Sequence, residues 1–195
     1  MIEYLLIVLG VFVFGLQHSG ISSLRVKSWI IDRWQKSGYA RIFNTTSVLA
    51  LLLAFLSMGY WDWAYFLTSP QTINVLLFGL GLIAVFAGLM LASAASKVIS
   101  VSTVADMRTD RKPQLVTDGI YSRVRHPLYL ATIVLLIGLA LLYPFPRVVV
   151  FAFSLSCYVL VGAYLEERKL IHHYGQEYLD YRKKVGFMLP RLRKK

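Results

Sequence analysis

Five apolar segments follow one another along this chain, each close to the length of about 20 residues with which an α-helix crosses a bilayer. They span approximately Tyr4–Leu24, Ile42–Tyr60, Ile73–Ala95, Leu128–Leu142 and Val148–Leu165. The fourth segment is short, and Pro144 and Pro146 after it predict a tight turn. We therefore expect the last two segments to form an antiparallel hairpin in an all-α integral membrane protein with about five transmembrane helices.

The composition favours the same class. Hydrophobic residues make up 57% of the chain and charged residues only 16%, whereas about a quarter of a soluble protein is charged. A net charge of +11 in a soluble protein would indicate nucleic-acid binding. Here the basic residues flank apolar segments, where they meet anionic lipid. Membrane lipids are thus the expected partners, and neither nucleic acid nor an obligatory protein partner is implied.

The basic residues also predict the orientation in the membrane. Five lie in the predicted loop between the first and second segments, six in the predicted loop between the third and fourth, and nine after the fifth, which leaves only Arg147 elsewhere. By the positive-inside rule, the amino terminus is outside and the carboxyl terminus is cytoplasmic. Because no basic region precedes the first segment, we interpret that segment as a retained span. A multi-pass protein of a prokaryotic plasma membrane is expected.

Two predicted cytoplasmic segments, residues 97–125 and residues 166–195, are too long to be simple connections. The first retains apolar residues such as Ile99, Val101 and Ile120, with which it can dock. The second is predicted to continue the fifth helix, and an amphipathic helix at the interface is the alternative. The apolar and aromatic residues that recur there at helical spacing are Leu170, Ile171, Tyr174, Tyr178 and Tyr181.

Residues whose side chains can bind ligands or exchange protons cluster in the segment LVTDGIYSRVRHPLY, from Leu115 to Tyr129. Pro127 suits the first turn of a helix, whose positive dipole end would lie beside Arg125 and His126. An arginine binds carboxylates bidentately, and a histidine exchanges protons near neutral pH. Asp118-Gly119 predicts a turn that a ligand can approach closely. Together these features predict an anion or cofactor site at the cytoplasmic face.

Two further polar groups lie at the predicted membrane boundary. Gln17–Ser19 is either functional or hydrogen-bonds between packed helices, and the residues alone leave both readings open. Glu166 and Glu167 are adjacent carboxylates, which are unfavourable at that depth unless Arg125 or Arg168 pairs with one of them. They would otherwise bind a ligand or form a solvated helix edge.

The sequence predicts no metal site. Cys157 is the single cysteine and, within an apolar run, is expected to be a small buried residue. His172 and His173 are adjacent, so on a helix they point in different directions.

LVTDGIYSRVRHPLYLATIVLLIGLAL, followed by EERKLIHHYGQEYLDYRKKVGFMLPRL, resembles the isoprenylcysteine carboxyl methyltransferase and phospholipid methyltransferase superfamily. The shared pattern is G-x-Y-x-x-x-R-H-P-x-Y, a hydrophobic hairpin, E-E, and F/Y-G-x-E-Y-x-x-Y ending in a proline. LQHSGISSLRVKSW, with Arg41 after it, resembles the methanethiol S-methyltransferase-like branch. The basic residue that usually follows Q-H-S is displaced here to Arg25.

This resemblance implies methyl transfer from S-adenosylmethionine, with S-adenosylhomocysteine as product, to a lipid, an isoprenoid carboxylate or a small thiol by in-line displacement. It implies cofactor contacts from Leu115, Val116, Gly119, Tyr121, His126, Pro127, Tyr129, Glu166, Glu167 and Tyr178. We expect catalytic roles for Arg125, His126, Glu167 and His18, and acceptor contacts from Gln17, His18 and Arg182. The proton of a thiol acceptor could pass to His18, His126 or Glu167.

We therefore expect a single domain over residues 1–195. Residues 1–96 would supply the acceptor side, and residues 97–195 would supply the cofactor-binding loop, the hairpin and the tail helix. An NADPH-dependent membrane reductase of the sterol or steroid type, which shares a related carboxyl-terminal pattern, is the alternative enzyme. A membrane scaffold without activity is the third hypothesis.

Overall fold

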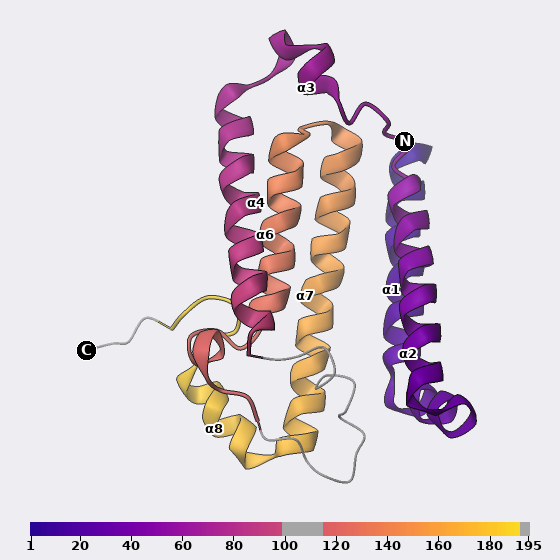
Figure 1. Ribbon diagram of the computed structural model, residues 1–195, viewed down its shortest axis with the longest axis vertical. Coiled ribbons are helices and arrows are strands. Elements are labelled where there is room, and N and C mark those ends of the chain that lie inside the picture. The colour runs from indigo at the N-terminus through magenta and orange to yellow at the C-terminus, as the bar shows by residue number, and fades with distance from the viewer. Residues whose placement is uncertain (99–114, 192–195) are drawn as a thin grey trace. The chain divides into compact units, whose positions relative to one another are not determined.

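The computed structural model of the chain describes residues 1–98 and 115–191, and within these residues the fold is helical (Figure 1). The described α-helices are α1 (Ile2–Ser22), α2 (Leu24–Leu56), α3 (Tyr65–Thr68), α4 (Val75–Ser96), α6 (Pro127–Leu142), α7 (Pro146–Tyr174) and α8 (Gln176–Lys184). Two 3-10 turns, η1 (Pro70–Thr72) and η2 (Gly119–Ser122), complete the regular structure of this part of the chain. The prediction of an all-α protein is confirmed for the described residues.

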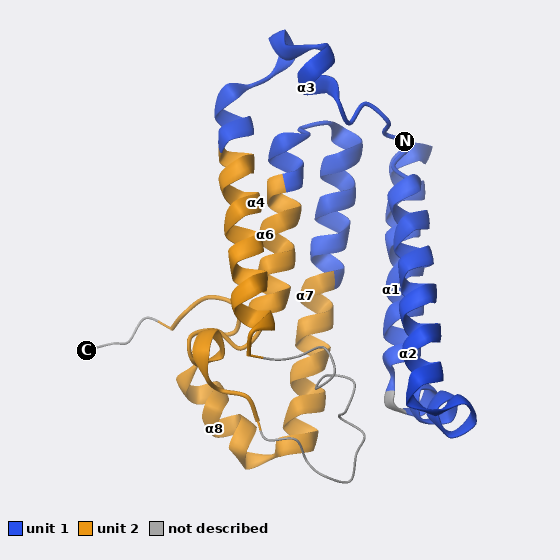
Figure 2. Cartoon of the chain, in the orientation of Figure 1, with its two compact units in different colours: residues 1–79, 139–158 blue, residues 80–138, 159–195 orange. Residues whose placement is uncertain are grey.

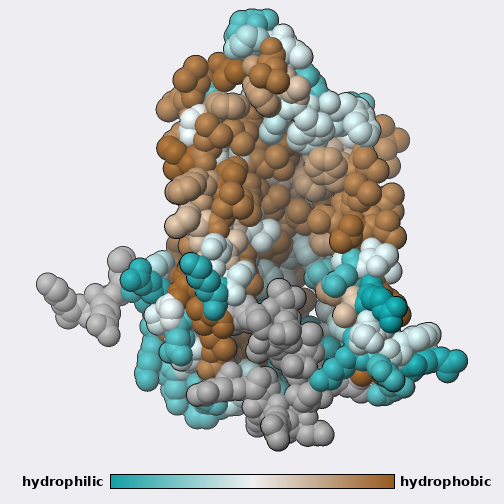
Figure 3. Space-filling view, viewed as in Figure 1, coloured by the Kyte–Doolittle hydropathy of each residue, from teal (hydrophilic) through white to brown (hydrophobic). Residues whose placement is uncertain are grey.

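The helices α1, α2, α4 and α7 are each long and apolar enough to cross a membrane. The helix α6 has 16 residues and is therefore about 24 Å long, somewhat shorter than the hydrocarbon core of about 30 Å. Large apolar side chains are exposed along α4, and they contribute to the hydrophobic surface in Figure 3. An exposed apolar surface of this kind is typical of an integral membrane protein. The predicted orientation of the helices stays a prediction.

Two compact units make up the chain (Figure 2). Unit 1 comprises residues 1–79 and 139–158, and unit 2 comprises residues 80–138 and 159–195. The helices α4, α6 and α7 contribute residues to both units.

In unit 1, the segment between the first two apolar segments was predicted to be a loop, and this prediction is wrong. Residues 24–56 are helical on both sides of Gln35, which alone interrupts α2 with φ 61° and ψ 178°. The arginines and lysines of this segment are good helix formers, so their charge does not prevent helix formation. Lys27 lies 5.4 Å from the ring centre of Tyr39, a cation–π contact across the break.

An aromatic cluster surrounds the turn between α6 and α7, within unit 1. The Tyr65 hydroxyl donates to the carbonyl of Leu142 at 2.6 Å, and the Tyr143 hydroxyl donates to the carbonyl of Trp63 at 2.9 Å. The first bond satisfies a carbonyl group at the end of α6, and the second joins the turn to the segment before α3, so together they hold the predicted tight turn in place.

The expectation that Cys157 is buried is wrong, because its side chain is exposed on α7. A run of apolar residues in a membrane protein faces lipid as readily as it faces protein, so hydropathy alone does not separate the two.

In unit 2, α4 and α6 pack closely at two glycines. A Cβ atom on Gly88 would lie 2.7 Å from Leu135 Cγ, and a Cβ atom on Gly138 would lie 2.7 Å from Val85 Cγ2. Real side-chain atoms do not approach so closely, so these positions require glycine for the observed helix spacing.

The tail of unit 2 also differs from the prediction. Instead of continuing α7 through Tyr181, the chain breaks at Gly175, whose φ of +61° and ψ of −126° favour glycine, and α8 then takes a new direction. Tyr178, Tyr181 and Val185 form a buried cluster in which Leu115 and three residues of α7 also pack. Of the loop residues predicted to dock, Ile120 is partly buried, while Ile99 and Val101 lie outside the described residues.

Candidate functional site

The segment before α6 is joined to the end of the tail by backbone hydrogen bonds. Val124 and Gly186 form an isolated parallel β-bridge. The Arg125 amide donates to the Gly186 carbonyl at 2.9 Å, and the His126 amide donates to the Phe187 carbonyl at 3.1 Å. Pro127 then begins α6 as predicted. Arg125 and His126 are therefore held on a fixed backbone, between the start of α6 and the tail.

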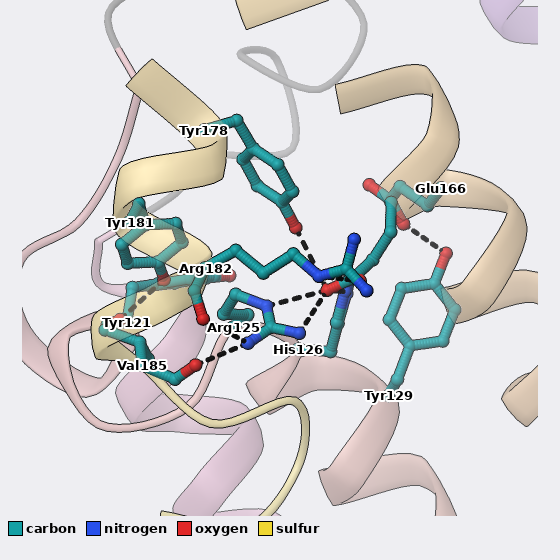
Figure 4. A network of polar contacts seen from close by, with 10 residues as sticks. Tyr121, Arg125, His126, Tyr129, Glu166, Tyr178, Tyr181, Arg182 and Val185 are labelled. Carbon is teal, nitrogen blue, oxygen red and sulfur yellow. Dashed lines mark hydrogen bonds and ion pairs between the residues drawn. The ribbon is translucent and has the colours of Figure 1, made fainter. Parts of the chain in front are cut away.

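The Glu167 carboxylate is the centre of the site, and the side chains that contact it are labelled in Figure 4: Arg125, His126, Tyr178 and Arg182. Glu167 comes from the cytoplasmic-side portion of α7 in the predicted orientation and is only 5% exposed. Its Oε1 atom accepts from Arg125 Nε at 2.6 Å and lies 2.6 Å from Arg125 Nη2. The same oxygen lies 3.3 Å from His126 Nε2 and accepts from the Tyr178 hydroxyl at 3.2 Å. Arg182 Nε lies 3.4 Å from Glu167 Oε2.

The structure thereby selects one of the two partners that the sequence offered for the acidic pair. Arg125 pairs with Glu167, whereas Arg168 donates to the Tyr164 hydroxyl at 3.1 Å on an exposed surface. The alternative prediction, that the acidic pair forms a solvated helix edge, is wrong for Glu167, because its carboxylate is buried and paired. Two carboxylates are thus accommodated at this depth because protein donors satisfy them.

The reversal of the chain at Gly175 makes this arrangement possible. Glu167 and Tyr178 are 11 residues apart, so in one continuous helix they would lie about 16 Å apart along its axis. In the structure the Tyr178 hydroxyl reaches the carboxylate, and its side chain is 1% exposed. The break in the helix therefore brings the tail back onto α7.

Arg125 is engaged by protein groups at each of its guanidinium nitrogens. In addition to the contacts of Nε and Nη2 with Glu167, its Nη1 donates to the carbonyls of Val185 and Arg182. Its guanidinium also lies 5.8 Å from the ring centre of Phe187. A guanidinium so fully bonded is fixed in position, and it fastens the tail to the start of α6.

The protonation states of the site follow from burial. Burial lowers the pKa of His126 below its usual range, although the nearby carboxylates of Glu166 and Glu167 act in the opposite direction. Burial likewise raises the pKa of Tyr178 above its usual range. At neutral pH the histidine is therefore uncharged and the tyrosine keeps its proton. Since the Glu167 carboxylate only accepts, the tautomer that fits this contact carries its proton on His126 Nε2 and leaves a lone pair on Nδ1.

Glu166 has its own donor. The Tyr129 hydroxyl, from the first turn of α6, donates to Glu166 Oε2 at 2.5 Å (Figure 4). Each glutamate of the pair is therefore held by a tyrosine, Glu166 by Tyr129 and Glu167 by Tyr178.

A cavity of about 490 Å³ adjoins this network within unit 2. It is lined by Arg125, Leu160, Arg182, Gly186, Phe187, Met188, Leu189 and Arg191. The volume lies in the range of about 300–1,000 Å³ that is typical of small-molecule sites. Because Glu167 balances Arg125, the guanidinium groups of Arg182 and Arg191 leave an excess of positive charge at this cavity.

The other predicted cofactor residues precede the network on the same segment. Leu115 packs against the tail cluster, and Val116 is partly buried. Gly119 has φ +57°, and a Cβ atom there would lie 2.9 Å from Val98 Cγ2, so the turn at this position favours glycine. The Tyr121 carbonyl accepts from the Tyr181 hydroxyl at 2.6 Å. The structure thus brings this segment onto the tail helix, and the cofactor contacts themselves stay predictions.

Sequence reasoning missed the contribution of Gly186 and Phe187. Their carbonyls bind the backbone of Arg125 and His126, and the Phe187 ring lies 4.9 Å from the His126 ring, centre to centre. Backbone pairing of this kind leaves no mark on side-chain patterns, so only the aromatic residue before the final proline offered a signal.

Gln17 and His18 belong to unit 1 and bond across α1 and α2. Gln17 Nε2 donates to Thr46 Oγ1 at 2.7 Å, and His18 Nδ1 lies 3.1 Å from Ser47 Oγ. These contacts agree with the helix-packing reading of the Q-H-S segment. The predicted roles of both residues toward the acceptor stay predictions.

Comparison with known proteins finds a matching family and several relatives. A sequence profile described as phospholipid methyltransferase matches residues 74–177. The chain is 29% identical over 204 residues to a methanethiol S-methyltransferase of Pseudomonas deceptionensis, an alignment that covers 96% of this chain and 72% of that protein. It is 28% identical to methanethiol S-methyltransferase 1 of Bradyrhizobium diazoefficiens, over 91% of this chain and 63% of the relative.

A third relative matches only part of the chain. The protein-S-isoprenylcysteine O-methyltransferase of Xenopus laevis is 38% identical over 78 residues, which are 39% of this chain and 27% of that protein. No solved structure matches the chain.

Proposed function

This chain belongs to the phospholipid methyltransferase family and is a membrane methyltransferase, and we propose that it transfers a methyl group from S-adenosylmethionine to a small thiol. A thiol acceptor is favoured because the methanethiol S-methyltransferases align with 96% and 91% of the chain. The isoprenylcysteine O-methyltransferase aligns with 39%. Neither the family nor these relatives support the reductase alternative.

The observation that carries the proposal is the buried Glu167 network beside the arginine-lined cavity. A carboxylate 5% exposed that gathers two arginines, a histidine and a tyrosine belongs to a built site rather than to a helix edge. A network of this kind holds each side chain in one geometry, as transfer between aligned atoms requires.

The residues at the cavity fit S-adenosylmethionine. The guanidinium groups of Arg182 and Arg191 suit its methionyl carboxylate, and the Phe187 ring suits its positive sulfonium. Leu160 and Met188 offer apolar surface to its base. Glu166, held by a tyrosine hydroxyl, presents a carboxylate suited to ribose hydroxyls. When bound, S-adenosylmethionine supplies an electrophilic methyl carbon on its sulfonium sulfur.

A thiol acceptor must lose its proton, because the thiolate is the nucleophile. We assign this proton to His126 Nδ1, since the ring is uncharged at neutral pH and its Nε2 atom faces Glu167. The Glu167 carboxylate orients the ring and stabilises the imidazolium that forms, as a carboxylate does for a general base. His18 and Glu167 are the other bases that the sequence offers, and the proposed step requires neither of them as a base.

The proposed site faces the cytoplasm. Twenty of the 21 lysines and arginines lie on the side of the membrane that the positive-inside rule assigns to the cytoplasm. S-adenosylmethionine is charged and polar and enters from that side, while an apolar acceptor enters from the bilayer. We retain a single domain over residues 1–195 as the organisation that fits this proposal.

Two measurements on the purified full-length chain in detergent test the proposal. S-adenosylhomocysteine is expected to raise the melting temperature more than NADPH does, because a ligand that binds only the folded state stabilises it. With a radiolabelled methyl donor, label is expected in methanethiol and not in an isoprenylcysteine analogue. His126→Ala should abolish transfer, whereas Asp180→Asn on the exposed face of α8 serves as the matched control. Stabilisation by NADPH alone would overturn the proposal.

A further inference from the structure

A second cavity, of about 390 Å³, lies within unit 1, lined by residues of α1 and of the second half of α2 with its C-cap. We call it the α1–α2 groove. Its lining residues are Leu6, Leu9, Gly10, Val13, Gln17, Ala50, Leu53 and Ser57. The positions on α1 recur at helical spacing and form one stripe, which extends about 16 Å from Leu6 to Gln17. None of the lining side chains is charged.

The orientation of the Gln17 amide at this groove follows from its hydrogen bonds. Thr46 has one hydroxyl proton, and it donates this proton to the Ile42 carbonyl at 2.7 Å. The Thr46 oxygen can then only accept, so Gln17 must present its NH₂ group, which donates at 2.7 Å. The amide oxygen, Gln17 Oε1, therefore points away from Thr46.

Gln17 Oε1 is buried and has no hydrogen-bond partner among residues 1–98 and 115–191. A buried carbonyl that loses water without gaining another donor is unfavourable. Because Gln17 lines the groove, small concerted changes in its side-chain torsions that leave Nε2 on Thr46 Oγ1 turn this oxygen toward the groove. The groove thus offers one acceptor at the end of an apolar surface.

We propose that the α1–α2 groove binds a single-chain lipid whose head carries an uncharged hydroxyl group. The hydroxyl donates to Gln17 Oε1, and the alkyl chain lies along Val13, Leu9 and Leu6. The head is uncharged because no charged side chain lines the groove, and burying an unpaired charge there would be strongly unfavourable. The volume, near the lower end of the range for ligand sites, suits one chain.

This site uses no residue of the Glu167 network. A negative result for the lipid site would therefore leave the proposed methyl transfer unaffected, and a negative result for methyl transfer would leave the lipid site unaffected. It assigns Gln17 a lipid hydroxyl as its partner in place of the methyl acceptor. In the predicted orientation Gln17 lies toward the cytoplasmic end of α1, at the depth where a lipid head meets the hydrocarbon core.

The test is photo-crosslinking of the full-length chain in detergent with a long-chain alcohol that carries a diazirine in its alkyl chain. The matched probe is its methyl ether, which has the same chain but no donor. We expect the alcohol to label peptides of α1 and α2, at a probe concentration at least about fivefold lower than the ether requires, since the ether cannot satisfy Gln17 Oε1. This comparison uses the unaltered chain and does not depend on the folding of a variant.

Two variants locate the site. Gln17→Met keeps the length of the side chain without the acceptor and should remove the preference for the alcohol. Val13→Trp fills the groove and should remove labelling by both probes. Leu16→Met, at an exposed position of the same helix that does not line the groove, is the control. Equal labelling by alcohol and ether, an unchanged preference in Gln17→Met, or crosslinks to a second copy of the chain would each overturn the proposal.

Discussion

The hydroxyl of Tyr178 provides the sharpest test of the Glu167 network, because Tyr178→Phe removes one oxygen atom and leaves the packing of the ring. The side chain is 1% exposed, and its hydroxyl donates to Glu167 Oε1 at 3.2 Å. A hydrogen bond to a charged group contributes about 1.5–3 kcal/mol. Since Arg125 remains 2.6 Å from the same oxygen, the carboxylate stays partly satisfied. We therefore expect a loss near the lower end, about 1.5 kcal/mol.

For a chain of this size, about 1.5 kcal/mol corresponds to a fall of about 3–6 °C in the melting temperature. Thermal unfolding in detergent, followed by circular dichroism, measures this change. Tyr164→Phe is the matched control, because its hydroxyl lies on an exposed surface and, within residues 1–98 and 115–191, accepts from Arg168 alone. An exposed contact of this kind contributes little, so the control should melt within about 2 °C of the unaltered chain.

The pH dependence and a double variant sharpen the test. Burial raises the pKa of Tyr178, so its hydroxyl keeps its proton and the difference from Tyr178→Phe should be constant from neutral to mildly alkaline pH. In the Glu167→Gln background the loss should shrink, because the charged acceptor is gone. Equal melting temperatures for Tyr178→Phe and Tyr164→Phe, or a loss unchanged by Glu167→Gln, would refute the role given to this hydroxyl.

Three further predictions concern the same unit and its surroundings. Glu167→Gln should lower the free energy of unfolding by about 3–5 kcal/mol in denaturant titrations, because it leaves a buried guanidinium without its counter-charge, whereas Asp180→Asn on an exposed surface should change it by less than about 0.5 kcal/mol. The pKa of His126 in the folded state lies below the unfolded value of 6.5. The contribution of the uncharged ring to the stability of the fold is therefore complete above pH 6.5 and is lost as the pH falls toward the folded pKa. In thermal melts at a series of pH values, His126→Gln should lose this part of the destabilisation by acid. Gly175→Ala should lower the melting temperature through backbone strain at φ +61° alone, since no described residue beyond its chain neighbours lies within 4 Å of the added Cβ. Gly20→Ala inside α1, where the described part of the chain also leaves the added Cβ free, should raise the melting temperature.

The extent to which the sequence predicted this structure depends on whether a feature is periodic. The apolar segments became helices because their length and hydrophobicity are local properties of the chain. The breaks at Gln35 and Gly175 were not predicted, since a single residue with positive φ interrupts a pattern that is otherwise compatible with a helix. The exposure of Cys157 was not predictable from hydropathy, which does not distinguish lipid from protein.

The candidate site was predicted in part for the same reason. The R-H-P segment and the acidic pair are recognisable as residue types, and the pairing of Arg125 with Glu167 was one of two possibilities. Choosing between them required the packing of α6 against α7. The role of Tyr178 depends on the reversal at Gly175, and the role of Phe187 depends on a backbone bridge, neither of which a side-chain pattern encodes.

The two arginines that contact Glu167 differ in how much of each guanidinium group protein atoms already bind. The side chain of Arg125 is 6% exposed, and Glu167 and two backbone carbonyls occupy its nitrogens, so it has little capacity left for a ligand. The side chain of Arg182 is 46% exposed, lines the cavity and touches Glu167 only through Nε at 3.4 Å. Its terminal nitrogens make no hydrogen bond to residues 115–191. The arginine within the recognisable motif therefore fastens the tail to the start of α6, and we propose that Arg182, outside that motif, binds an anionic ligand group.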